Sequence, residues 1–242
     1  MSTPLLNQQK EEHMINAVGF ISSLSLAVVA MSTLLIAGFT PPMTGPLATG
    51  TVISYPYTDI LSRFPRDYYW MYPAMLLMLI YIVFMACVEV YAGKSGNIFK
   101  RIALLLSVIG AGVIFIDYFV QISVIQPSII NGEADGIALL TQYNPHGVFI
   151  ALEEAGYILI TMSLVLLAPS LNSAGRIMTA LRWTAILSFL LTVISFVVIS
   201  YIYGVEREYR FEVAVITIVY ISLTIFGILW SIIFKRARNH KQ

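Results

Sequence analysis

The stretch VIFIDYFVQISVIQPSIINGEADGIALLTQYNPHGVFIALEEAGY (residues 113–157) begins inside one apolar run of the chain and ends inside the next. Between the two runs lies a link, 127–146, that holds no lysine or arginine and contains the turn-forming pair Asn144-Pro145. An apolar run of about 20 residues is long enough to cross the hydrocarbon core of a bilayer as a helix. The stretch therefore predicts two antiparallel membrane helices joined by one loop.

The composition of the whole chain places it in lipid. Of its 242 residues, 58% are hydrophobic and only 11% are charged, whereas soluble domains carry about 25% charged residues. Apolar runs long enough to span a bilayer occur at about 15–39, 71–92, 102–126, 147–168, 183–204 and 213–235. We therefore expect an all-α, polytopic membrane protein whose six helices form one bundle and one domain, 1–242. A long loop, 40–70, joins the first two spans, and the other links are short.

The distribution of basic residues predicts the orientation of this bundle. If the N-terminus is cytoplasmic, ten lysines and arginines flank the cytoplasmic ends of the spans and four arginines lie outside, in agreement with the positive-inside rule. Six spans then place the C-terminus in the cytoplasm as well, and the loops 40–70 and 127–146 outside. The expected location is the plasma membrane, with the lipid bilayer as partner, and no feature of the chain points to nucleic acid.

Acidic residues inside the spans are the strongest functional signal. Asp117 lies ~22 Å along the third span at 1.5 Å per residue, and Gln121 follows one turn later on the same face. Glu153 and Glu154 lie ~10 Å into the fourth span from the same membrane surface. His146 precedes Glu153 by two helical turns and shares its face. Because these two spans are antiparallel neighbours, we expect the five residues to meet in a polar pocket in the outer half of the bundle.

Charges at this depth need compensation. An ionised side chain at the bilayer centre costs at least ~2.5–3.5 kcal/mol, and no lysine or arginine lies well inside any of the predicted spans. The acids are therefore protonated, bind a cation, or pair with external arginines. The candidate counter-ions are Arg63, Arg66, Arg207 and Arg210. A purely structural hydrogen-bond network that fixes helix packing is the alternative.

Several other chemistries find no support in the motifs. The single cysteine, Cys87, rules out an internal disulfide, and the chain has no Walker, dinucleotide-binding or GxSxG motif. No lysine inside a span could hold retinal and no pair of intramembrane histidines could hold haem, so we expect no cofactor. The link 127–146 adds oxygen donors and His146, but their spacing matches neither an EF-hand nor a zinc signature, which leaves a metal site open.

Three segments of the chain carry a resemblance. They are YPYTDILSRFPRDYYWMYPA (55–74), DYFVQISVIQPS (117–128) and LTQYNPHGVFIALEEAGY (140–157). They resemble segments of a family of prokaryotic six-span integral membrane proteins to which no activity is assigned. The resemblance covers most of 40–165 and implies the six-span architecture and a prokaryotic cell membrane. It implies no functional residues.

The acids favour a protein that binds or transports a small molecule, a cation or a proton. Asp117 and Glu153 or Glu154 would be the ionisable groups, oriented by Gln121 and His146. One alternative is an intramembrane enzyme that acts on a lipid-like substrate with the acids as general acid and base, although no basic cluster suits a phosphate headgroup. Another is a membrane assembly subunit without pocket chemistry. The balance favours a non-enzymatic role, and a cavity lined by Asp117 and Glu153 would discriminate between these functions.

Overall fold

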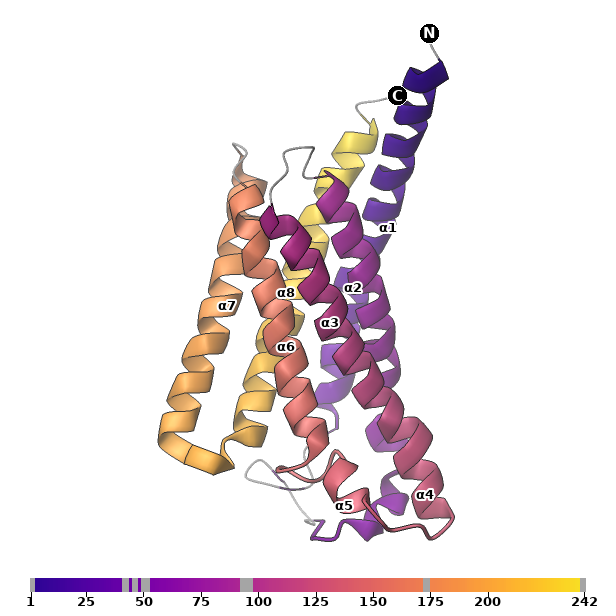
Figure 1. The fold of residues 1–242 in the computed structure, drawn as a ribbon, viewed down its shortest axis with the longest axis vertical. Coiled ribbons are helices and arrows are strands. Elements are labelled where there is room, and N and C mark those ends of the chain that lie inside the picture. The colour runs from indigo at the N-terminus through magenta and orange to yellow at the C-terminus, as the bar shows by residue number, and fades with distance from the viewer. Residues whose placement is uncertain are drawn as a thin grey trace.

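Six long helices form the protein, which is known here from a computed structural model that describes residues 3–40, 44, 48, 53–91, 98–171 and 175–239. Among these residues every regular element is helical. The long helices are α1 (Thr3–Gly38), α2 (Met71–Tyr91), α3 (Ile98–Val120), α6 (Val148–Leu167), α7 (Arg176–Tyr203) and α8 (Glu208–Asn239) (Figure 1). Each contains an 18-residue window with a mean hydropathy between 1.8 and 2.5, so each can cross a bilayer by length and composition. The chain is therefore a multi-pass helical membrane protein, and the predicted fold class is confirmed.

Both chain termini lie at one end of the bundle (Figure 1), which we call the termini end. At the opposite end, the loop end, lie three short helices, η1 (Thr58–Arg63), η2 (Arg66–Tyr68) and α5 (Ile137–Leu140), and the turn η5 (Gly204–Glu206) between α7 and α8. A further turn, η4 (Ala168–Ser170), follows α6 at the termini end. The long loop after α1 is thus partly helical where it is described, and residues 41–43, 45–47 and 49–52 lie outside the described part.

The helices pack closely where small residues face each other. α1 packs against α2 and α8, α3 packs against α6, and α7 lies against α6 and α8. A β-carbon at Gly227 of α8 would stand 2.5 Å from the carbonyl oxygen of Ser23 in α1, and one at Gly110 of α3 would stand 3.0 Å from the carbonyl oxygen of Gly156 in α6. Helix backbones therefore touch at these two crossings, as small residues permit in a membrane bundle.

Several helices extend beyond the apolar runs that predict them. α1 begins at Thr3 rather than near residue 15, α7 at Arg176 rather than near 183, and α8 covers Glu208–Asn239 rather than 213–235. Hydropathy reports only the part of a helix that suits lipid, whereas the ladder of backbone hydrogen bonds continues into polar flanks.

The third span also runs further than expected, because Gln126 and Pro127 do not end it. α3 continues through a π-helical turn, η3 (Gln121–Ile125), into α4 (Gln126–Ile130). Proline lacks the N–H that an α-helix needs in its interior, and the π turn just before it replaces the usual bonding pattern with a wider one. The helix passes the proline, and the link to α6 is correspondingly shorter.

Candidate ligand-binding site

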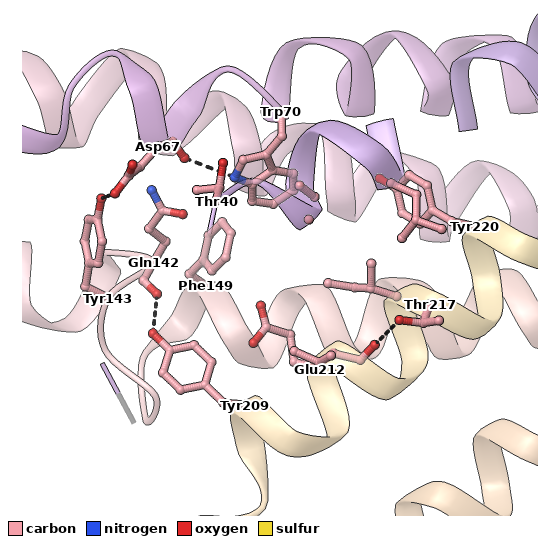
Figure 2. Close-up of a pocket in the computed structure, with 15 residues that line it drawn as sticks. Thr40, Asp67, Trp70, Gln142, Tyr143, Phe149, Tyr209, Glu212, Thr217 and Tyr220 are labelled. Atoms are coloured by element: carbon pink, nitrogen blue, oxygen red, sulfur yellow. Dashed lines mark hydrogen bonds between the residues drawn. The ribbon is translucent and has the colours of Figure 1, made fainter. Parts of the chain in front are cut away.

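A cavity of about 370 Å³ lies at the loop end of the bundle, between α1, α6 and α8 (Figure 2). Its volume is within the range of small-ligand pockets, about 300–1,000 Å³. The sequence predicts a pocket between α3 and α6; this cavity shares α6 with that prediction, through Phe149, but its other walls come from α1, α8 and the loop end and not from α3. Its lining residues are Leu34, Ala37, Gly38, Thr40, Asp67, Trp70, Gln142, Tyr143, Phe149, Tyr209, Glu212, Val213, Ile216, Thr217 and Tyr220.

Aromatic rings supply much of the cavity wall. They are Trp70, Tyr143, Phe149, Tyr209 and Tyr220. Hydrogen bonds orient several of them: the Trp70 indole Nε1 donates to the Asp67 carbonyl oxygen at 3.0 Å, and the Tyr209 hydroxyl donates to the Gln142 carbonyl oxygen at 2.8 Å (Figure 2). These hydrogen bonds fix the orientation of the rings in the cavity wall.

Two carboxyl groups belong to the same lining. The side chain of Glu212 extends from α8 toward the middle of the cavity (Figure 2). Asp67 is buried and accepts a hydrogen bond from the Tyr143 hydroxyl at 3.1 Å, and burial raises the pKa of Tyr143, so the tyrosine stays a donor. Arg66 lies 3.8 Å from Asp67, but its side chain is 63% exposed and screened by solvent. The residues that line the cavity include no lysine or arginine.

Behind Glu212, the acids of α6 and α3 form a second layer. Glu153 is fully buried, and its carboxyl group interacts with that of Glu212. Asp117 is 3% exposed and interacts with Glu153. None of the three forms an ion pair with a lysine or arginine of the described residues. The structure thus groups acids from α3, α6 and α8, of which only Glu212 reaches the cavity wall.

A chain of tyrosine hydroxyls connects this acidic group to the cavity by another route. Tyr118 donates to Glu153 Oε1, and the hydroxyls of Tyr118 and Tyr157 lie 2.7 Å apart. The hydroxyls of Tyr157 and Tyr220 are separated by 3.1 Å, and Tyr220 lines the cavity. Glu153 is therefore connected to the cavity wall by two routes. One passes through Glu212, and the other passes through the hydroxyls of three tyrosines.

Glu154 has a different environment from its neighbour Glu153. Arg207 Nη1 donates to Glu154 Oε2 at 2.6 Å, and the two groups form an ion pair that is mostly buried, with side-chain exposures of 26% and 7%. The guanidinium also lies over the rings of Phe196 and Phe211, with centroid distances of 4.8 and 5.9 Å. Of the four candidate counter-ions, Arg207 is thus placed beside one of the predicted acids.

The other predicted site residues lie apart from the cavity wall. Gln121 is buried and binds the backbone of the loop before α6. Its Nε2 donates to the Leu140 carbonyl oxygen at 2.6 Å, and its Oε1 accepts from the Gln142 backbone N–H at 3.0 Å. His146 is exposed, and its backbone N–H donates to Asn144 Oδ1 at 2.9 Å. Gln121 therefore positions a loop that lines the cavity.

Two further candidate arginines are engaged near the surface. Arg66 pairs with Asp67, as described above. Arg210 is stacked on Tyr203, 3.9 Å from the ring centroid, and donates to the Glu206 carbonyl oxygen at 2.8 Å. Arg63 ends η1 and is half-buried. Within the described part of the chain, none of these three arginines forms an ion pair with Asp117 or Glu153.

The sequence alone did not single out Glu212, Asp67 or the tyrosine chain. Glu212 reads as the last member of a charged turn, yet it lies in the first turns of the last span, at the level of Glu153 in the fourth. That shared level is the signal that could have identified it. The tyrosines Tyr118 and Tyr157 fall inside apolar runs, where a buried aromatic ring is the usual interpretation.

The described residues contain no group of three or more histidines, cysteines or carboxylates arranged to hold a metal ion. Comparison with known proteins gives no homologue: no protein-family model, no curated protein and no solved structure matches the chain.

Proposed function

We propose that this protein binds a small organic cation, an amine or a quaternary ammonium compound, in the loop-end cavity, as a binding or transport protein of the membrane. The observation that carries the proposal is the lining itself. Five aromatic rings surround a space into which Glu212 extends, and none of the described residues that line this space is a lysine or an arginine.

This combination of groups suits a cation by its charge and by its shape. A cation over an aromatic face gains about 0.5–2 kcal/mol, with the larger value in desolvated sites, and cages of such rings recognise quaternary ammonium groups. The Glu212 carboxylate offers the counter-charge, and the acids behind it make the potential of the cavity more negative. An anion would meet repulsion, and a neutral ligand would leave the carboxylate without a partner.

The predicted site residues keep a role in this proposal. Glu153 and Asp117 lie behind Glu212 and make the potential of the cavity more negative. Gln121 holds the loop that carries Gln142 and Tyr143, and His146 lies at the end of the same loop. Since the loop end is the end expected outside the membrane from the positive-inside rule, the cavity would receive its ligand from outside a prokaryotic plasma membrane. The resemblance of the three segments to prokaryotic six-span proteins agrees with that location.

A pair of probes that differ only in charge tests the proposal. Choline and its neutral isostere 3,3-dimethylbutan-1-ol are titrated separately against the purified protein in nanodiscs, and binding is followed by calorimetry. We expect choline to bind at least tenfold more tightly than the neutral isostere, a difference of about 1.4 kcal/mol. Equal binding of the two probes, or no binding of choline, would contradict the proposal.

The variant Glu212→Gln locates the site. It keeps the size of the side chain and removes the charge, so we expect the Kd for choline to rise at least tenfold, with little change for the neutral isostere. Glu133→Gln is the matched control, because Glu133 is exposed on the loop after α4 and does not line the cavity. If Glu133→Gln weakened choline binding as much as Glu212→Gln did, the cation would be bound elsewhere.

A further inference from the structure

Two carboxyl groups adjoin each other at the back of the cavity. Glu212 lines it, and Glu153 lies behind Glu212 with its side chain fully buried. Glu153 Oε1 accepts a hydrogen bond from Tyr118, whereas Glu153 Oε2 has no hydrogen-bond partner of ordinary geometry among the described residues. An acceptor atom left open at this depth, beside a second carboxyl group, indicates a place for a positive charge or a proton.

Within the described part of the chain, the nearby arginines do not supply that positive charge. Arg207, the cation nearest in the chain to Glu212 apart from Arg210, is committed to Glu154 at 2.6 Å, and Arg210 is stacked on Tyr203. Among the residues that the structure describes, the ionisable groups that face Glu153 and Glu212 are acids and hydroxyls from all three packed helices. They are Asp117 and Tyr118 of α3, Glu154 and Tyr157 of α6, and Tyr209 and Tyr220 of α8.

Two adjacent carboxylates in a low-dielectric interior cannot both be ionised without a compensating charge, so such pairs share one proton. We infer that Glu153 and Glu212 share a proton while the cavity is free of cation and release it when the cation binds, so that the site exchanges one organic cation for one proton. The inference rests on the proposed function, because the incoming cation supplies the charge that replaces the proton.

Charge and protons balance in this exchange. Without the cation, the pair carries one negative charge and one proton. When the cation binds, the O–H bond of the shared proton breaks, the proton passes to water, and the pair carries two negative charges beside the positive charge of the ligand. The net charge of the site is the same before and after, which keeps a charge imbalance out of the interior of the bundle. The hydroxyl chain from Tyr118 through Tyr157 to Tyr220 links Glu153 to the cavity as a route for the departing proton.

Choline serves as the probe because its positive charge is the same at every pH between 6 and 8. Calorimetric titrations in buffers of different ionisation enthalpy count the protons released, and titrations at several pH values give the Kd. For the wild-type protein we expect about one proton released per choline bound. Since the proton and the cation compete, the Kd should rise as the pH falls, by up to about tenfold per unit.

The variant Glu153→Gln separates this inference from the proposed function. Glutamine keeps an oxygen that can accept from Tyr118, and Glu153 does not line the cavity. We expect proton release to fall from about one to near zero, and the remaining choline binding to become independent of pH. Glu133→Gln should release the same number of protons as the wild-type protein, and circular dichroism with size-exclusion chromatography checks that each variant folds.

The outcomes distinguish the two claims. Choline binding by the wild-type protein without proton release would overturn the exchange and leave the cation site standing. Proton release that persists in Glu153→Gln, or a wild-type Kd that does not change with pH, would overturn the assignment to this pair. Absence of choline binding would overturn both the proposed function and the exchange that rests on it. If Glu153→Gln fails to fold, the proton count and pH profile of the wild-type protein decide the matter.

Discussion

Glu153 and Glu154 are neighbours in the chain and lie at the same depth in the bundle, but they meet different partners. Glu154 forms an ion pair with Arg207 at 2.6 Å, and that arginine is covered by the rings of Phe196 and Phe211. Glu153 meets Tyr118 and the carboxyl groups of Asp117 and Glu212, with no lysine or arginine of the described residues paired to it. Adjacent residues of a helix point about 100° apart, so one turns toward α7 and its loop and the other toward the cavity side of α8.

The difference shows that two acids at the same depth of a membrane helix can be compensated in different ways. A carboxylate whose charge is matched by a half-buried arginine already has its counter-charge, and the pair stabilises the fold by joining α6 to the α7–α8 turn. A carboxyl group surrounded by other carboxyl groups needs a proton or a cation. The two residues of this dipeptide therefore face different electrostatic environments on the two sides of α6.

The largest effect on stability is expected at the ion pair between Arg207 and Glu154. Arg207→Met should lower the free energy of unfolding by about 3 kcal/mol, because it leaves Glu154 buried without its partner. The exposed part of the Arg207 side chain places the loss at the lower end of the usual range. Thermal unfolding in detergent, followed by circular dichroism, measures it.

Arg210→Met is the control for this variant, since Arg210 is half-buried over the ring of Tyr203 and does not pair with a buried acid of the described residues. It should change the free energy of unfolding by less than about 0.5 kcal/mol. A double variant, Arg207→Met with Glu154→Gln, should recover most of the loss. Equal losses for the two arginine variants would remove the distinction between the two sides of α6.

A smaller effect is expected from Tyr118→Phe. The change removes the hydroxyl that donates to Glu153 Oε1 and meets Tyr157 at 2.7 Å, so a buried carboxyl oxygen loses its donor. We expect a loss of about 2 kcal/mol in the free energy of unfolding, measured in the same way. Tyr201→Phe serves as the control because Tyr201 is 90% exposed, and a loss as large in that variant would show that the tyrosine network is not the cause.

The smallest effect compares the two glutamates directly. Glu154→Gln should lower the free energy of unfolding by about 1 kcal/mol, because it removes the charge from an ion pair with a partly exposed arginine. Glu153→Gln should leave it unchanged or raise it slightly, because one acid is removed from a group of like charges. A loss in Glu153→Gln that equals or exceeds the loss in Glu154→Gln would show that Glu153 is the more important residue for stability.

Several residues of the candidate site could be predicted from the sequence, but their arrangement could not. The levels of Asp117, Glu153 and Glu154 follow from counting residues along two antiparallel helices, and the structure places all three in buried positions. Gln121 lies on the expected helix, yet it binds loop backbone. Counting predicts correctly that α3 and α6 are packed neighbours, and Gly110 and Gly156 bring their backbones together. It cannot predict that α8 places Glu212 beside Glu153 or that a cavity lies between α1, α6 and α8.

The sequence by itself determined that six apolar helices form one bundle. The length of each apolar run matches the thickness of the bilayer, and in lipid such a run satisfies its backbone hydrogen bonds as a helix. Tertiary structure alone decided which arginine compensates Glu154, that Glu212 joins Glu153 from the far end of the chain, and that the cavity lies between α1, α6 and α8. The physical reason is that burial in lipid depends on the composition of each segment separately. Ion pairs, shared protons and cavities depend on the rotation of each helix about its axis, which the packing of all the helices sets together.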